Sequence, residues 1–124
     1  MALTVTPKEN LSYRTVKHAS VSSAAQVNVT GGAVTVYGIT IVNGAHTTIH
    51  TCFLDGSFDT TSAVGTTAPT MIFGVPTAST RTMMIPEGVT FSGGMNIWTK
   101  QEPGTAGASN PAGGTVTVYV TTGV

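Results

Sequence analysis

The C-terminal part of the chain shows the clearest alternation of apolar and polar positions. Across residues 115–121, Val116, Val118 and Val120 alternate with threonine and tyrosine. Because successive side chains of a β-strand point to opposite faces, this period of two predicts a strand with one buried face.

Segment 33–43 is apolar on both faces of a predicted strand. One face holds three valines and the other three larger residues: Val34, Val36 and Val42, then Tyr37, Ile39 and Ile41. A strand that is apolar on both sides is typical of a central position covered from both directions, here in part by another subunit. We therefore expect Tyr37, Ile39 and Ile41 to belong to a subunit interface.

Asn43-Gly44 follows this strand and indicates a type I′ hairpin turn, because both residue types tolerate positive φ. Residues 46–54 are then expected to run back antiparallel to it, with Ile49, Thr51 and Phe53 on one face.

Further short strands are predicted between glycine- and proline-rich turns, at residues 11–16, 26–30, 71–75, 80–85, 89–91 and 94–100. Residues 3–6 would form an N-terminal arm or an edge strand. We expect 89–91 to pair with 94–100, and 55–70 and 101–114 to be long loops. Together with the segments above, this gives about eight or nine short strands, which predicts an all-β, antiparallel β-sandwich of jelly-roll-like type.

The chain has 124 residues, the length of a single domain. Within it we expect residues 1–30 to supply an N-terminal arm and edge strands, and residues 31–124 to form the core of the sandwich. The sequence Val-Thr-Val-Tyr follows Gly-Gly-Ala at 31–37 and Gly-Gly-Thr at 113–119. Internal duplication and chance similarity both explain this, and chance is favoured in a chain rich in threonine and valine.

Charge is scarce and balanced, with five acidic and five basic residues and a formal net charge of zero. This argues against a nucleic-acid partner, because phosphate contacts need clustered lysine and arginine. No apolar run is long enough to span a bilayer, so we expect no membrane partner. The first residues lack the pattern of a signal peptide, and the single cysteine excludes an intrachain disulfide; both indicate synthesis in a cytoplasm.

His46 and His50 have a spacing that binds metal on a helix, but on a strand they lie about 13 Å apart. His50 and Cys52 share a face without an evident third ligand. We therefore expect no metal site and no cofactor.

Asp55 and Asp59 could act as paired carboxylates, but a turn role for Asp55-Gly56 is favoured. Ser57, His50 and Asp55 could form a catalytic group, yet the sequence contains no strained nucleophile turn. We expect no catalytic residues and no enzymatic activity.

Trp98, Tyr13, Tyr37 and Tyr119 could form a platform on which sugars stack. A role for Trp98 in the core or in an interface is favoured, because it alternates with apolar residues within the predicted strand 94–100. The mildly basic N-terminal segment with Lys8, Arg14, Lys17 and His18 could dock on an acidic protein surface, and we include Arg14 and Lys17 in the expected interface. Their alternative role is to protect an edge strand against aggregation.

A resemblance to a known family rests on four elements in order. They are the strand 36–43 carrying Tyr37, the turn Pro86-Glu87-Gly88, the element Phe91-Ser92-Gly93-Gly94, and the terminal strand 116–119. Across residues 33–121 this order resembles small β-sandwich virion structural proteins of tailed bacteriophages.

The resemblance implies a structural protein of the virion, made in the host cytoplasm: a capsid decoration (cement) protein, or a head or tail accessory protein. It also implies a homo-oligomer, expected to be a trimer, that contacts the major capsid protein or another virion protein. The alternative function is a receptor- or carbohydrate-binding module of a phage fibre or tail. That function would gather Trp98, Phe58 and a tyrosine in one open groove.

Overall fold

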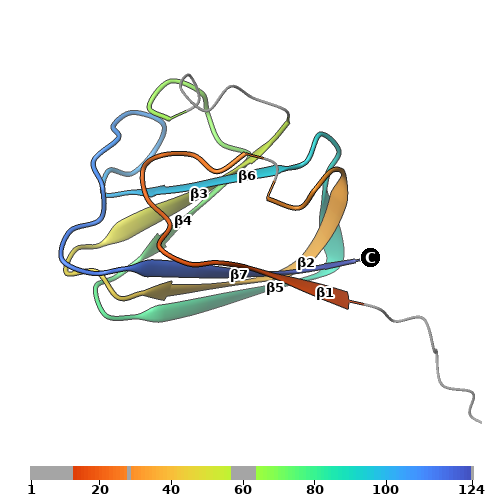
Figure 1. Ribbon diagram of the computed structural model, residues 1–124, viewed down its shortest axis with the longest axis horizontal. Coiled ribbons are helices and arrows are strands. Elements are labelled where there is room, and N and C mark those ends of the chain that lie inside the picture. Colours follow the sequence, from red (N-terminus) through yellow and green to blue (C-terminus); the bar gives the residue numbers. More distant parts are fainter. Residues whose placement is uncertain (1–12, 28, 57–63, 124) are drawn as a thin grey trace, which may run out of the picture.

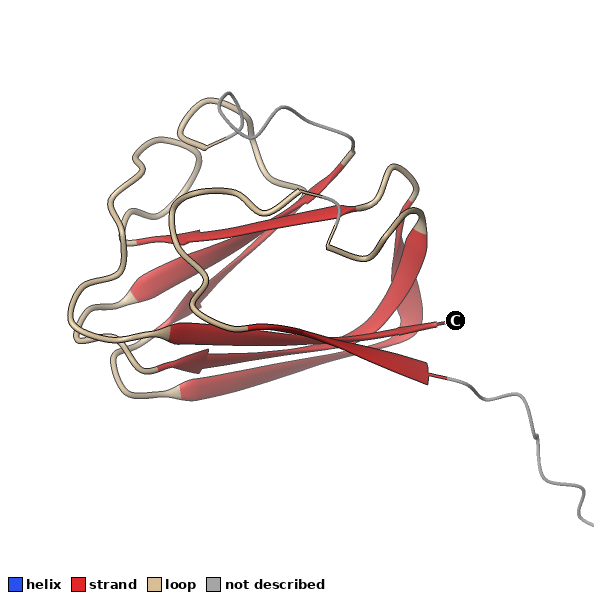
Figure 2. Ribbon diagram, in the orientation of Figure 1, coloured by secondary structure: helices blue, strands red, loops and turns tan. Residues whose placement is uncertain are grey.

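The computed structural model describes residues 13–27, 29–56 and 64–123, which form two antiparallel sheets packed as a sandwich (Figure 1). Only strands and loops occur in these ranges, and no helix in them could span a membrane (Figure 2). The predicted all-β fold class is therefore confirmed. The strands are β1 (Tyr13–His18), β2 (Val34–Asn43), β3 (Ile49–Asp55), β4 (Met71–Val75), β5 (Thr80–Phe91), β6 (Met95–Lys100) and β7 (Val116–Gly123).

One sheet has the strand order β1-β7-β2-β5 and the other has the order β4-β3-β6. Their inner faces enclose the main core, in which Val36, Ile41, Phe53, Phe91 and Val118 are fully buried. Burial of this apolar surface is the main force that holds the two sheets together.

Strand β7 follows the prediction made from its alternation. Val116, Val118 and Val120 all point into the core and are 0 % exposed, whereas Tyr119 points outward. Strand β3 does the same on the opposite sheet, where Ile49 and Phe53 enter the main core and Thr51 is buried with them.

Strand β2 departs from the prediction at Tyr37. Val36 pairs with Thr122 and Gly38 with Thr121, so Tyr37 is an extra residue, a β-bulge. The bulge reverses the alternation, and consequently Ile39 and Ile41 face the core together with Val36. The expectation that Ile39 and Ile41 share the face of Tyr37 is wrong.

Asn43-Gly44 does not make the predicted hairpin. Strand β2 pairs with β5 and β7, and β3 lies in the other sheet. The buried Asn43 side chain donates from Nδ2 to the carbonyl oxygens of Thr47 and Val75, each at 3.0 Å, and accepts from the amide of Ala45 at 2.9 Å. Asn43 thus anchors a crossover between the sheets.

The predicted strands 80–85 and 89–91 are one strand, β5, which pairs with β2. The turn expected at Pro86-Glu87-Gly88 is instead an irregular segment within the strand, between the pairs Met84–Gly38 and Val89–Val36. Strand β6 pairs with β3, so the expected pairing of 89–91 with 94–100 is also wrong.

The predicted strand 26–30 is reduced to a single bridge, Gln26–Ile97, against the edge of β6. This loss, and the merging within β5, leave seven strands in the described ranges instead of eight or nine. The possible strand at 3–6 lies outside those ranges.

Candidate functional site

The outer face of the four-stranded sheet is not covered by any described segment, as the lower side of Figure 1 shows. We call it the open face. Its side chains follow from the alternation and registers of the four strands, and threonines dominate among them. Two cross-strand threonine pairs lie on it, Thr40–Thr82 with hydroxyls 3.1 Å apart and Thr35–Thr90 at 3.2 Å.

A hollow of about 370 Å³ lies in the open face and is lined mainly by carbon atoms. We call it the tyrosine hollow. The rings of Tyr13 and Tyr37 meet edge to face, with centroids 5.5 Å apart and planes at 83°. Tyr13 is 54 % exposed and Met84 is 74 % exposed, which is unusual for side chains of this size. The lining residues are Tyr13, Tyr37, Met84, Pro86 and Thr121.

Two backbone irregularities create this hollow. Tyr37 points outward by alternation with the buried Val36, and the bulge in β2 places Gly38 on the same side of the sheet, where a Cβ atom would lie 3.6 Å from the Met84 sulfur. In β5, Gly88 has φ +77°, and a Cβ atom there would lie 3.0 Å from the Tyr37 ring. Gly88 therefore lies against the Tyr37 ring and leaves no room there for a side chain, and Pro86 borders the same hollow.

Tyr37 also borders a second hollow of about 310 Å³, shared with Thr35, Thr90 and Gly123 among others. Its ring is thus a wall between two depressions of the same face. A fixed aromatic side chain flanked by hollows is a shape suited to contact with another molecule.

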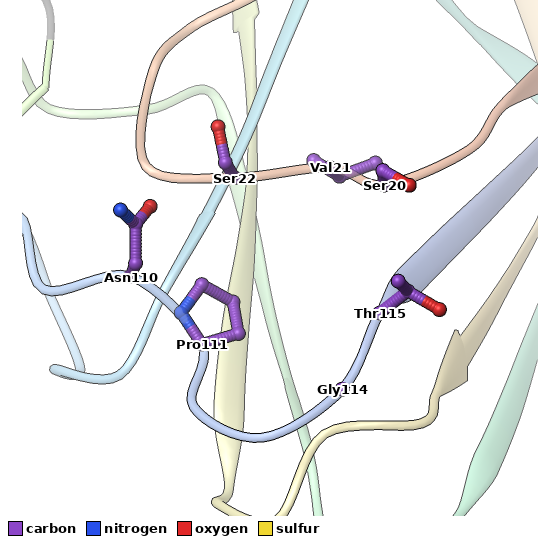
Figure 3. Close-up of a pocket in the computed structure, with 7 residues that line it drawn as sticks. All are labelled: Ser20, Val21, Ser22, Asn110, Pro111, Gly114 and Thr115. Carbon is purple, nitrogen blue, oxygen red and sulfur yellow. The ribbon is translucent and has the colours of Figure 1, made fainter.

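A smaller hollow of about 220 Å³ lies between residues 20–22 and 110–115, which face each other in Figure 3. Its main polar side chain is already bonded, because Asn110 Oδ1 accepts from the Ser23 amide at 2.8 Å and from the Ser23 hydroxyl at 2.7 Å. Val21 in addition donates its amide to Val116. The hollow therefore lies at a junction where hydrogen bonds hold two loops together.

The residues expected at an interface occupy three environments. Tyr37 lines the tyrosine hollow, and Lys17 lies on the same face with Nζ 5.8 Å from the centre of the Tyr119 ring. Arg14 is exposed on edge strand β1 and donates from Nη2 to the Thr30 carbonyl at 2.9 Å. Ile39 and Ile41 are 1 % and 0 % exposed and belong to the core.

The candidate catalytic side chains hold loops in place. His50 Nδ1 lies 2.9 Å from the carbonyl oxygen of Gln101, and Asp55 accepts from the amide of Gly93 at 2.8 Å. The His46 ring packs against Gly113, where a Cβ atom would lie 2.5 Å from Nδ1. Ser57 and Asp59 lie outside the described residues.

Potential metal ligands do not converge: in residues 13–27, 29–56 and 64–123, no group of three or more His, Cys, Asp or Glu could hold an ion. Burial raises the pKa of the Cys52 thiol from 9.0 to about 11, against a smaller opposing effect of the Lys100 charge. Cys52 is therefore a neutral thiol near pH 7, which is a poor ligand and a poor nucleophile.

The four aromatic residues considered for sugar stacking lie on two sheets. Trp98 is 1 % exposed and packs with Ala25, Cys52 and Leu54 on the outer side of the three-stranded sheet. Tyr13, Tyr37 and Tyr119 belong to the open face of the other sheet, and Phe58 lies outside the described residues. The four residues therefore form no single platform, and Trp98 lies in a small core, in agreement with the favoured interpretation.

Sequence reasoning missed Met84, Pro86 and Thr121, which complete the tyrosine hollow. One signal could have found the bulge behind it, since a glycine inside an apolar strand often marks such an irregularity, and Gly38 stands directly after Tyr37. No protein-family model matches the chain, and no curated protein is similar to it in sequence.

Proposed function

We propose that this protein is a non-enzymatic structural protein of a phage virion. Its function is capsid decoration: as a symmetric oligomer, expected to be a trimer, it binds and stabilises the assembled capsid by contacting the major capsid protein or another virion protein. It is made in the host cytoplasm. The observation that carries the proposal is the tyrosine hollow, where large apolar side chains are held exposed on an uncovered sheet.

Exposed apolar groups around a hollow commonly mark contact sites between proteins. Here they lie on a surface with few charges, next to two backbone irregularities, in β2 and β5. A decoration protein gains affinity from many modest contacts made at once, because a symmetric oligomer raises the effective concentration of each contact.

The use of polar side chains supports a mechanical role over a catalytic one. His50, Asp55 and Lys100 all hold backbone groups of neighbouring loops. Each contact fixes the shape of a loop and leaves the group committed to a structural partner.

The alternative function, a receptor- or carbohydrate-binding module of a fibre or tail, is favoured by one observation: Tyr13 and Tyr37 form an exposed aromatic pair. Sugars stack on such rings, but they also need polar side chains around their hydroxyls. The tyrosine hollow offers tyrosine and threonine hydroxyls, and its lining includes no carboxylate and no amide side chain.

The test is to locate the protein on particles. Virions from the phage that encodes the chain would be imaged by electron microscopy with antibodies against the protein, and its copy number measured by quantitative mass spectrometry. Decoration predicts labelling over the whole capsid at many copies per particle. Labelling confined to tail tips, together with binding on a glycan array, would establish the alternative function, and absence from purified virions would refute both.

A further inference from the structure

Met84 is the most exposed large apolar residue in the part of the chain that the structure describes, at 74 %. The other methionines of that part lie in different surroundings. Met95 is 0 % exposed in the main core, and Met71 and Met83 are partly buried against that core. Among these thioethers, Met84 is therefore the one that a reagent dissolved in water reaches first.

The Met84 sulfur lies against the sheet, at a position where the strand beside it has no side chain. Gly38 pairs with Met84 on one side and with Thr121 on the other. A Cβ atom at Gly38 would lie 3.6 Å from the Met84 sulfur and 3.8 Å from Thr121 Cβ. The sulfur and the Thr121 side chain thus flank the same gap, and both belong to the tyrosine hollow.

The lining of the tyrosine hollow also suits an oxidised form of Met84. Oxidation converts an apolar thioether into a polar sulfoxide, whose oxygen accepts hydrogen bonds. Thr121, Tyr13 and Tyr37 bring hydroxyl donors to the same hollow, and its lining includes no carboxylate that would repel the new oxygen. The added oxygen would therefore have donors close by, in a hollow that is lined mainly by carbon atoms before oxidation.

We propose that Met84 is an oxidation site, at which a peroxide makes the tyrosine hollow polar. The sulfur lone pair attacks one oxygen of hydrogen peroxide, and the S–O bond forms as the O–O bond breaks. The hydroxide that leaves takes the proton of the transferred oxygen and becomes water. The sulfur loses two electrons and the peroxide gains them, so the step is balanced without a cofactor. Methionine sulfoxide reductases reverse such a change.

The cysteine of the chain does not compete for the peroxide in the folded protein. Cys52 is 0 % exposed, and its thiol is neutral near pH 7, whereas the thiolate is the nucleophilic form. Exposure therefore directs the peroxide to a thioether on the open face and away from the thiol on the covered side.

The inference goes beyond the proposed function and does not depend on it, because it needs only an exposed sulfur at the hollow. In a protein that makes contacts through the tyrosine hollow, oxidation would weaken those contacts. A polar sulfoxide has to give up its bound water when a partner covers it, and this costs free energy unless the partner supplies a hydrogen bond.

The first experiment treats the folded full chain with hydrogen peroxide at neutral pH and follows each methionine by peptide mapping and mass spectrometry. We expect Met84 to react at least about tenfold faster than Met95, with Met71 and Met83 between them. In urea the rates should converge, because unfolding exposes every sulfur. A Met84 rate close to that of Met95 in the folded protein would overturn the proposal.

The second experiment measures what oxidation does to the hollow. NMR spectra of the peroxide-treated protein should show shifted signals for Gly38, Thr121 and the Tyr37 ring, and a methionine sulfoxide reductase should return them to their original positions. The urea midpoint should stay the same, because Met84 lies outside the core. The matched variant Met84→Leu keeps an apolar side chain without sulfur, and its signals should not respond to peroxide.

Two outcomes of this second experiment would count against the proposal. Signals of the hollow that stay in place after Met84 is oxidised would show that the hollow is not changed, and an equal response in Met84→Leu would show that another group is responsible. Either result leaves the location of the protein on virions to its own test.

Discussion

The outer faces of the two sheets differ in what covers them. Loops around β3 and β6 lie over the outer side of the three-stranded sheet in Figure 1, whereas the open face of the four-stranded sheet has no described cover. Beneath those loops Trp98, Cys52 and Leu54 are 5 % exposed or less, whereas Tyr13 and Met84 on the open face are more than half exposed. The same kind of strand thus supports a second small core on one side and a contact surface on the other.

The difference comes from side chains that tie loops to the covered side. Asn96 donates from Nδ2 to the carbonyl oxygens of Leu54 and Gly56, and the fully buried Lys100 donates from Nζ to those of Thr105 and Ala106. On the open face the threonine pairs bond only within the sheet. Polar groups therefore decide which face is closed, because buried loop carbonyls need donors.

Replacing Trp98 with alanine should give the largest change, because it empties the small core on the covered side. We expect the free energy of unfolding to fall by about 3–5 kcal/mol, measured by urea denaturation. The matched change on the open face, Met84→Ala, should cost less than about 0.5 kcal/mol in the monomer. Equal losses for the two variants would contradict the difference between the faces.

Asn96→Ala should have an intermediate effect, about 1–3 kcal/mol, because it leaves the buried Leu54 carbonyl and the partly buried Gly56 carbonyl without their side-chain donor. Thr82→Ala removes an exposed hydroxyl pair on the open face and should change stability only slightly. Chemical denaturation of both variants measures the contrast. If Asn96→Ala were neutral, the ties to the covering loop would not stabilise the fold.

Gly88→Ala probes the support behind Tyr37. The new methyl group would lie 2.5 Å from Thr35 Cγ2 and 3.0 Å from the Tyr37 ring, at φ +77°. Gly104 has a similar φ of +73° with nothing within 4 Å, so Gly104→Ala measures the backbone strain alone. We expect Gly88→Ala to cost about 1 kcal/mol more than Gly104→Ala, with altered Tyr37 ring signals in NMR spectra. Equal costs would show that segment 85–88 does not fix the ring.

Ionisation of the Cys52 thiol should have no effect on stability near pH 7 and a measurable effect in alkali. Its folded pKa of about 11 lies above the ordinary 9.0, so the unfolded chain loses the proton first as the pH rises. Stability should therefore fall between these two pH values, and Cys52→Ala should remove that part of the loss. At pH 8 the thiol of the folded protein should react with a disulfide reagent far more slowly than in urea; rapid labelling would mean that the cover opens easily.

The similar sequences of β2 and β7 show how far the residue pattern predicts the fold. Val34 and Val36, like Val116 and Val118, point into the core as the alternation indicates. After the tyrosine the two strands differ. Gly38 follows Tyr37, at the bulge, whereas Val120 follows Tyr119 and the alternation of β7 continues unbroken. Local pattern therefore predicted the inward and outward positions of β7 over residues 116–121, and those of β2 only as far as its bulge.

Pairing between strands and the tyrosine hollow could not be predicted in the same way. The turn propensity of Asn43-Gly44 pointed to a hairpin, but partners more than 30 residues away, such as Val75, decide what Asn43 does. Tyr13, Tyr37 and Met84 lie on three strands, and their meeting depends on registers that no single segment encodes. Alternation alone predicted that Tyr37 faces away from Val36, and Gly38, as the mark of a bulge, could have predicted that Ile39 and Ile41 turn into the core.

The bulge also changes how the length of a central strand can vary. Deleting one residue from such a strand normally turns every later side chain to the wrong face. Loss of Tyr37 would instead leave Val36, Gly38 and Ile39 in regular alternation, with the inward positions of the strand preserved. The chain thus holds, at the middle of a sheet, a site where an insertion or a deletion can create or erase a surface feature while the interior stays the same.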